Sequence, residues 1–137
     1  MRTTLDVVDI VWQWLNASPL KAAITGGIYK YRPQNSTSED VVINSLPITG
    51  EQVQEGVVNV NIHVPNPILN SNGTQDQSQA NHPRLKELAS IAVESLTDIW
   101  VESAEVNFTV QNQMVFPEPD NNEHYVNIRL SFISVNL

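Results

Sequence analysis

Two histidines on predicted strands are the residues of this 137-residue chain whose type and position could support catalysis or metal binding. His63 lies on the polar side of the alternating stretch 57–64, and His124 begins a later stretch beside Glu123. If these strands are neighbours, the two imidazoles and an acid such as Glu123 could bind a metal or shuttle protons. Nothing in the spacing requires this, and isolated surface histidines are commoner. We therefore expect no catalytic residue, no metal site and no cofactor.

The other motifs give no stronger indication of an enzyme. The paired His-x-Ser/Thr motifs of some phosphoesterases need hydroxyls where Pro65 and Val126 stand here, so a phosphate would lose two hydrogen-bond donors. The chain contains no glycine-rich nucleotide loop, Walker motif, HExxH motif, nucleophile elbow or EF-hand loop. It also has no cysteine, which excludes disulfides and thiolate metal ligands.

Charge and hydropathy argue against two classes of partner. Seven basic and fifteen acidic residues give a net charge of −8, and the basic residues are scattered along the chain. Specific nucleic-acid binding is therefore not expected, because it needs clustered Lys and Arg to displace phosphate counterions. The apolar stretch near the N-terminus is too short for a membrane span and is interrupted by Asp6 and Asp9. We expect no membrane partner.

Hydrophobic periodicity predicts the elements that would position these residues. Val7, Val11 and Leu15 recur at helical spacing after the capping pair Thr3 and Asp6. The expected elements are a helix over 4–16, a short helical turn over 19–24, strands over 27–32, 40–46 and 57–64, a helix over 83–100, and strands over 106–116 (with a bulge at Asn112) and 125–135. This order, α-β-β-β-α-β-β, predicts a single α+β domain over 1–137. Its sheet is mainly antiparallel, with about five strands and the helices packed on one face.

A long polar loop over residues 66–82 separates the third strand from the second long helix. It is rich in Asn, Gln and Ser and shows no periodicity. Loops of this length are uncommon inside compact domains and are often functional or disordered. We expect it to be a contact arm that a neighbouring molecule orders.

The residues expected at a partner interface are amides and one histidine in loops or on polar strand faces, together with one tryptophan. Uncharged amides can bond to a partner at modest desolvation cost, although a plain solvent-facing surface explains any single Asn equally well. Trp12 falls off the apolar stripe of its helix, so we expect it to be exposed, whereas Trp14 and Trp100 are expected in the core. The predicted interface residues are Trp12, Asn35, Asn59, Asn61, His63, Asn70, Asn72, Gln75 and Gln77.

Three segments carry a resemblance to a known family. They are the helix DVVDIVWQWLN, the strand entry TGGIY and the strand VVNVNIHVPN, within a similar order of elements along nearly the whole chain. In these features the chain resembles the tail-terminator and tail-completion proteins of long-tailed bacteriophages. The resemblance implies a structural protein, not an enzyme, made in the cytoplasm of a bacterium that carries the phage or prophage and then incorporated into the virion.

The resemblance further implies a homo-oligomeric ring, typically of six subunits, at the head-proximal end of the tail. Its partners would be other copies of the chain, the tail tube protein and the head connector protein. Strand edges and the loops at 33–40 and 66–82 would make the contacts, and acids lining the lumen would repel passing DNA. The alternative is a small intracellular enzyme or ligand-binding domain that uses His63, His124 and nearby acids.

Overall fold

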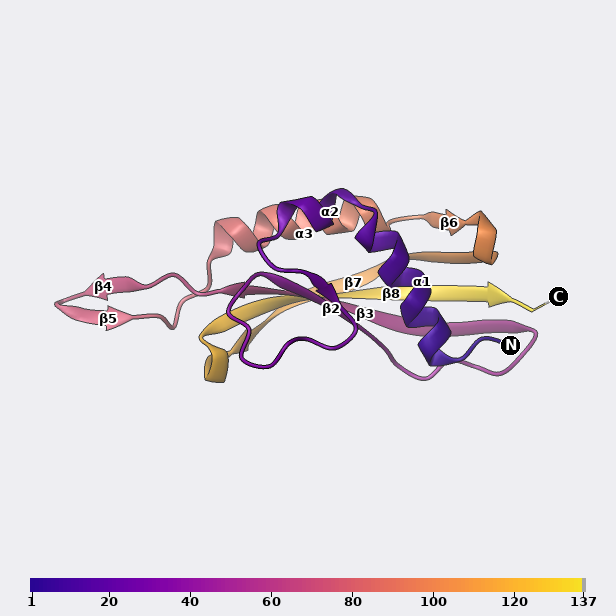
Figure 1. The fold of residues 1–137 in the computed structure, drawn as a ribbon, viewed down its shortest axis with the longest axis horizontal. Coiled ribbons are helices and arrows are strands. Elements are labelled where there is room, and N and C mark those ends of the chain that lie inside the picture. The colour runs from indigo at the N-terminus through magenta and orange to yellow at the C-terminus, as the bar shows by residue number, and fades with distance from the viewer. Residues whose placement is uncertain (137) are drawn as a thin grey trace.

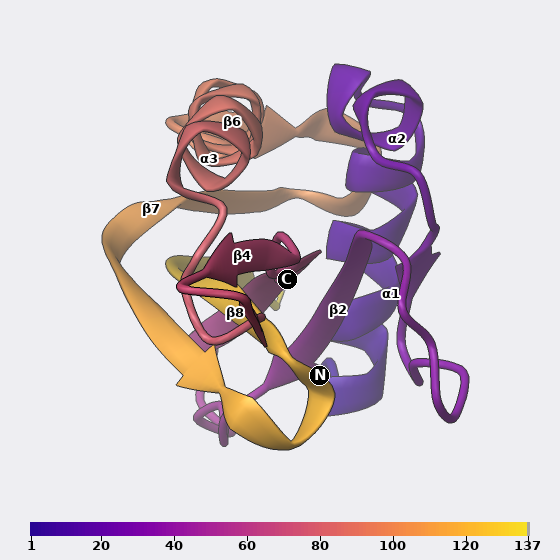
Figure 2. The ribbon, with the colours of Figure 1, turned by 90° about the vertical axis from the view of Figure 1, so that its left-hand side faces the viewer.

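The computed structural model describes residues 1–136 and shows an α+β fold (Figure 1). Three helices lie on one face of a curled, mainly antiparallel six-stranded sheet, and the opposite face carries no helix among the described residues (Figure 2). The helices are α1 (Thr4–Asn16), α2 (Pro19–Ala23) and α3 (His82–Leu96). None of the helices in residues 1–136 has the length and apolarity that crossing a membrane requires.

The six-stranded sheet has the order β1-β2-β3-β8-β7-β6, in which only the pairing of β1 with β2 is parallel. Its strands are β1 (Ile28–Tyr29), β2 (Asp40–Ser45), β3 (Val53–Pro65), β6 (Ile99–Val101), β7 (Val106–Glu118) and β8 (Glu123–Val135). A separate two-stranded hairpin consists of β4 (Leu69–Ser71) and β5 (Thr74–Asp76). Two short 3-10 turns, η1 (Glu102–Ala104) and η2 (Pro119–Asn121), lead into β7 and β8.

Alternation along β3 and β8 places the core between the sheet and the helices. These two strands pair along their whole lengths, from Val53 opposite Val135 to Pro65 opposite Glu123. Because successive side chains point to opposite faces, every second residue is buried beneath the helices. The buried set comprises Val58, Val60, Ile62 and Val64 of β3 and Val126, Ile128, Leu130 and Phe132 of β8. The inward faces predicted for both strands are thus confirmed.

The N-terminal helix follows its sequence signals. Thr3 accepts a hydrogen bond from the backbone N–H of Asp6, and the Asp6 carboxylate accepts one from the backbone N–H of Thr3, so the capping box is complete. Hydrogen bonds from the backbone and hydroxyl of Thr3 lower the pKa of Asp6. Val7, Val11 and Leu15 form the predicted stripe and are fully buried.

Several predicted boundaries and the strand count were wrong. The sheet has six strands where about five were expected, and the first strand covers only Ile28–Tyr29 where 27–32 was expected. The second long helix ends at Leu96, so residues 97–100 are not helical. Thr97 is extended there, and Asp98 adopts a left-handed conformation with φ 53°, which ends the helix and starts β6.

The 66–82 segment is not the aperiodic loop that was expected, because it contains the β4–β5 hairpin. Asn72 and Gly73 have φ values of 51° and 80°, as a two-residue type I′ turn requires at both central positions. The hairpin projects from one end of the molecule along its long axis (Figure 1). We call residues 68–76 the arm.

A bulge in β7 was predicted at Asn112 and is confirmed. The pairing with β8 shifts between Val110, which is opposite Leu130, and Asn112, which is opposite Arg129. One extra residue reverses the side-chain alternation beyond it. After the bulge, Gln113 and Val115 therefore face the side of the sheet on which the helices lie.

An ion pair between Arg84 of α3 and Glu39, the residue before β2, should be a major contributor to stability. Two guanidinium nitrogens of Arg84 lie 2.7 and 2.8 Å from the Glu39 carboxylate, which is nearly buried. Substituting Arg84→Met leaves that carboxylate unpaired, so we expect the free energy of unfolding to fall by about 3 kcal/mol in urea denaturation. In the control, Lys30→Met removes an exposed pair with Asp9 and should cost less than about 1 kcal/mol. Equal losses in the two variants would contradict the prediction.

Candidate functional site

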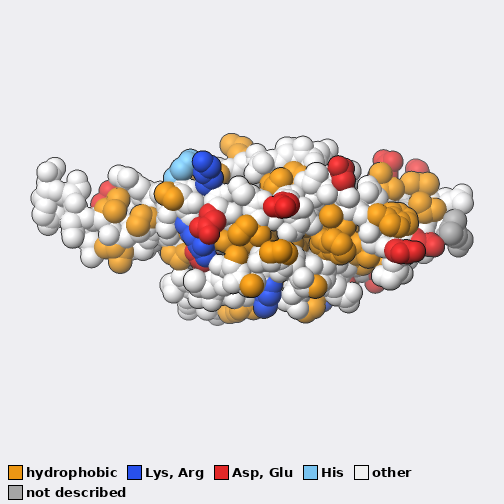
Figure 3. Space-filling view, turned by 90° about the horizontal axis from the view of Figure 1, so that it is seen from above, with side chains coloured by type: hydrophobic (Ala, Val, Ile, Leu, Met, Phe, Trp, Pro, Cys, Tyr) orange, Lys and Arg blue, Asp and Glu red, His pale blue; other side chains and the backbone are white. Residues whose placement is uncertain are grey.

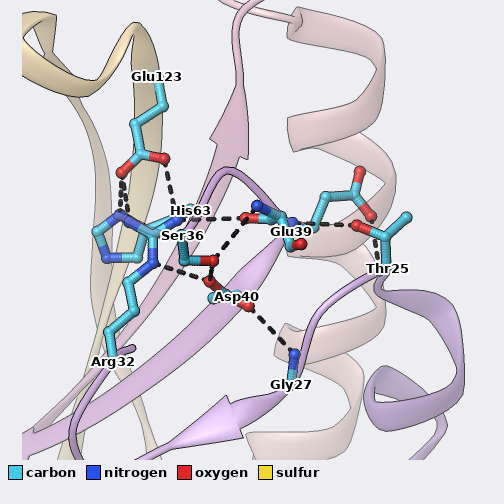
Figure 4. A network of polar contacts seen from close by, with 9 residues as sticks. Thr25, Gly27, Arg32, Ser36, Glu39, Asp40, His63 and Glu123 are labelled. Atoms are coloured by element: carbon cyan, nitrogen blue, oxygen red, sulfur yellow. Dashed lines mark hydrogen bonds and ion pairs between the residues drawn. The ribbon is translucent and has the colours of Figure 1, made fainter. Parts of the chain in front are cut away.

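A cluster of four ionisable side chains lies at one end of the uncovered sheet face (Figure 4). Arg32 donates two hydrogen bonds to Glu123, at 2.6 and 3.0 Å, and one to Asp40, at 2.9 Å. The Nδ1 atom of His63 lies 2.9 Å from the same Glu123 carboxylate. Glu123 and Asp40 are almost completely buried. Arg32 thus ties the connection after β1 to strands β2 and β8.

The electrostatics of this cluster favour a fixed charge network. Burial acts to raise the pKa of Asp40, but hydrogen bonds from Ser36, Arg32 and the backbone of Gly27 outweigh it and lower that pKa. Burial is also the largest influence on His63, where it lowers the pKa, and the nearby Arg32 charge lowers it further. The opposing attraction of Glu123 is too small to reverse the shift. His63 is therefore neutral, and it lies beside a carboxylate that Arg32 already holds.

The two histidines that the sequence singled out do not share a site. His63 pairs with Tyr125 in the β3–β8 register, whereas His124 pairs with Val64, so the two imidazoles point to opposite faces of the sheet. The Nδ1 atom of His124 lies 2.7 Å from the side-chain oxygen of Asn66. Within residues 1–136, no three His, Asp or Glu side chains are grouped closely enough to hold a metal ion.

The uncovered face of the sheet carries a ladder of hydrogen-bonded amides, to which the predicted interface residues Asn59 and Asn61 belong. Asn59 donates to Asn44 at 3.1 Å, and Asn127 donates to Asn61 at 2.7 Å and to Asn59 at 3.3 Å. These amides satisfy one another across three strands, which lowers the cost of covering them with another surface.

A hollow of about 580 Å³ lies over this amide ladder. Phe116 and Tyr125 stack at one end of it with ring centroids 5.5 Å apart, and Arg129 lies on its wall. His63 lies against the other side of the Tyr125 ring, at a centroid distance of 5.0 Å. The hollow is therefore lined mainly by amides and aromatic rings, with Arg129 as its one charged side chain.

The arm leaves the body through a pair of reciprocal amide hydrogen bonds. Asn66 donates to the backbone oxygen of Gln77 at 3.0 Å, and the Gln77 side chain donates to the backbone oxygen of Asn66 at 3.1 Å. The backbone N–H of Asn66 also donates to Asn122, at 2.9 Å. Asn66 is 5% exposed. We call the Asn66–Gln77 pair the root clamp. Gln77, which was predicted at a partner interface, is thus hydrogen-bonded within its own chain.

Beyond the root clamp, almost every arm side chain is exposed. The predicted interface residues Asn70, Asn72 and Gln75 lie here, in the hairpin. Ile68 and Leu69 are apolar, yet they are 60% and 38% exposed. Seen from the helix side, apolar atoms lie toward the base of the projecting hairpin and uncharged polar atoms form its tip (Figure 3). The arm therefore joins an apolar base to an amide-rich tip.

Asn35 stands at the exposed tip of the 33–39 connection. It adopts a left-handed conformation with φ 62°, which asparagine tolerates better than most residues. Apart from Trp12 on α1 and Gln77 in the root clamp, the predicted interface residues thus lie in three regions: the 33–39 connection, the uncovered sheet face and the arm.

The tryptophan predictions were wrong in their burial. Trp12 is half-buried, because its indole N–H donates to the backbone oxygen of Ile28 at 2.9 Å and Lys30 lies over its ring. Trp14 is 36% exposed, although one edge packs on Phe108 and its N–H donates to Ser95. Trp100 lies on the edge strand β6 and is 56% exposed. The exposed indoles are thus Trp14 and Trp100.

An apolar groove between α3 and β7 was not expected from the sequence. It has a volume of about 820 Å³ and is lined mainly by Leu85, Ala89, Val93, Met114, Val115 and Val126. Met114 and Val115 are 61% and 47% exposed. The signal that could have revealed it is the run Met114-Val115-Phe116 after the predicted bulge, because three successive apolar residues place at least one on each face of a strand.

The pKa direction of His63 gives a testable pH dependence. Its pKa lies below 6.5 in the folded protein, so between that value and 6.5 the unfolded chain binds a proton that the folded chain does not. The free energy of unfolding should therefore fall as the pH drops through about 6.5. In the His63→Asn variant, the free energy of unfolding measured by urea denaturation should depend less steeply on pH in this window. If its dependence on pH is unchanged, His63 is not the cause of the loss of stability.

Comparison with known proteins adds no relative from which a role could be transferred. No protein-family model matches the chain, and no curated protein matches it. The resemblance to tail-terminator proteins therefore stays a prediction, and the positions of the arm, the sheet face and the groove are the observations from which a function can be proposed.

Proposed function

We propose that the chain is a structural subunit of a phage or prophage tail-completion ring, which caps the tail tube and joins it to the head. The arm is the observation that carries this proposal. It exposes Ile68 and Leu69 on a hairpin that extends beyond the body (Figure 1), where burial by another chain would be favourable. Apolar side chains exposed on a projecting hairpin are typical of an element that contacts a neighbouring molecule.

The root clamp supports this reading, because it fixes the direction of the arm before assembly. Gln77 and Asn66 bond reciprocally, and Asn66 is held to Asn122 and His124 of the body. A fixed direction lowers the entropy lost on binding. The arm thus resembles a preorganised connector more than a flexible linker.

The sheet edges offer one long stretch for contact with a neighbouring copy. The edge strands β1 and β6 contain only two and three residues, and β6 pairs only with Val106–Phe108 of β7. Among the described residues, the outer edge of β7 from Thr109 to Glu118 therefore has no partner strand, and its free backbone groups can accept a neighbouring strand. The arm is the largest projection among the described residues (Figure 1).

Charge is distributed in a way that bears on the proposed DNA passage. The concave sheet face is lined by amides, whereas Glu102 and Glu105 lie around η1, at the end of the molecule opposite the arm. If the concave face lines the lumen, amides surround the DNA and the acids lie toward one opening of the ring. Both surfaces lack the clustered cations that would hold phosphates.

The alternative enzyme or ligand-binding function has less support. His63 is held in the Arg32–Glu123 network and His124 lies on the opposite face, so the two histidines do not supply a common site.

Light scattering across a concentration series tests the ring directly. We expect a mass that is a multiple of the 15.3 kDa protomer, with ring-shaped particles in electron micrographs. Strictly monomeric protein at every concentration, with no rings, would overturn the proposal.

A shortened variant tests the role of the arm. Replacing residues 68–76 with Gly-Ser-Gly retains Asn66 and Gln77 at the root clamp, so the melting temperature should change little. Assembly should be lost, because the exposed apolar base and the tip are then missing. If the shortened chain assembles like the parent, the arm is a tolerated insertion without a role in assembly.

A further inference from the structure

The groove between α3 and β7 leaves apolar side chains uncovered in the folded chain. Its floor and walls include Leu85, Ala89 and Val93 from α3 and Val115 from β7. The bulge at Val110/Asn112 creates it, because the shifted alternation turns Val115 toward the helix side. Val115, which faces the helix side, is 47% exposed, so the groove is a surface that association would bury.

The chain's own arm does not fill this groove. The groove begins near Ala80 and His82, just after the arm returns to the body, but the root clamp directs the arm away from α3 along the long axis (Figures 1 and 2). Folding back would break the Asn66–Gln77 bonds and leave the side-chain N–H group and the backbone oxygen of the nearly buried Asn66 without these partners. The arm of another molecule can enter the groove without breaking its own root clamp.

We propose that the arm of one copy docks in the α3–β7 groove of a second copy. This inference rests on the proposed function, namely that copies of the chain assemble, and it names the two surfaces that meet. The apolar base of the arm, Ile68 and Leu69, supplies side chains that a groove of about 820 Å³ with apolar walls can accommodate. Docking would bury the exposed apolar side chains of the arm and those of the groove together.

One pair of charges at the two surfaces is complementary, while Glu94, the acid that also lines the groove, lies nearer the C-terminal end of α3. Asp76 is the one ionisable side chain of the arm, and Lys86 lies on the groove wall near the N-terminal end of α3. Among the described residues, Lys86 forms no ion pair. A docked arm brings the Asp76 carboxylate to the end of the groove that carries this free cation.

This contact is heterologous, since the arm and the groove are different surfaces of the same chain. Each copy can therefore donate an arm to one neighbour and accept an arm from another, which generates a closed ring or an open filament. A two-fold dimer would instead use the same contacts on both copies. The difference can be measured by mixing variants.

The experiment uses two variants that each lose one surface. The arm variant carries Ile68→Ser and Leu69→Ser, and the groove variant carries Ala89→Gln and Val115→Glu. Each alone should be monomeric in light scattering, while the parent assembles. Mixed in equal amounts, they should form a 1:1 pair and nothing larger, because one intact arm and one intact groove remain.

The control variant is Val53→Glu, which changes a valine as exposed as Val115, 45% against 47%, on β3 away from the groove. It should assemble like the parent. If it is monomeric too, or if the groove variant assembles like the parent, the assignment of the groove is overturned while the proposed ring stands. A monomeric parent would instead overturn the proposed function. Loss of assembly in the arm variant alone would place the arm on another surface and overturn the inference.

Cysteine cross-linking gives a second measurement that does not depend on the stability of the multiply substituted variants. The parent chain contains no cysteine, so single cysteines report one contact each. Copies with Ile68→Cys mixed with copies carrying Ser90→Cys, at the groove, should form a disulfide-linked dimer under mild oxidation. Ser103→Cys, on the exposed turn after β6, should give none with Ile68→Cys. Equal cross-linking at both positions would contradict docking in the groove.

Discussion

The pairing of β3 with β8 at the centre of the sheet is the constraint on which the other features depend. Its register fixes which residues face the helices and which form the concave amide-rich surface. The same register brings Glu123 beside His63 and, through Arg32, ties the long 30–39 connection to the sheet. A shift of one residue would turn the valines of β3 to solvent and its asparagines into the core, which makes any other alignment of the two strands very costly.

The elements that could be predicted are those whose pattern is local and strong. The capping pair and apolar stripe of α1, the alternation of β3 and β8, and the bulge at Asn112 were all visible in neighbouring residues. The arm was not, because its Asn72-Gly73 turn is flanked by polar residues such as Asn70 and Gln75, which show no hydrophobic alternation. Ile99 continued the helical spacing of Leu96, but the left-handed conformation of Asp98 ended the helix before it.

The candidate surfaces were predictable only in part, since they depend on contacts between distant segments. Arg32 and Glu123 are 91 residues apart, so no local pattern indicates their pairing. Trp12 falls off the apolar stripe of its helix, yet the backbone of Ile28 and the side chain of Lys30 cover it. The groove depends on the position of α3 over β7 as well as on the bulge, and periodicity does not describe how a helix lies on a sheet.

The root clamp has a consequence for how such a protein can change through evolution. Asn66 and Gln77 close the base of the arm with backbone and amide bonds, so the residues between them contribute little to the core. Insertions, deletions and substitutions in this segment are therefore tolerated by the body of the protein. If the arm is the contact element proposed above, recognition can diverge there while the fold is kept, and exchange of this one segment offers a route to a new binding preference.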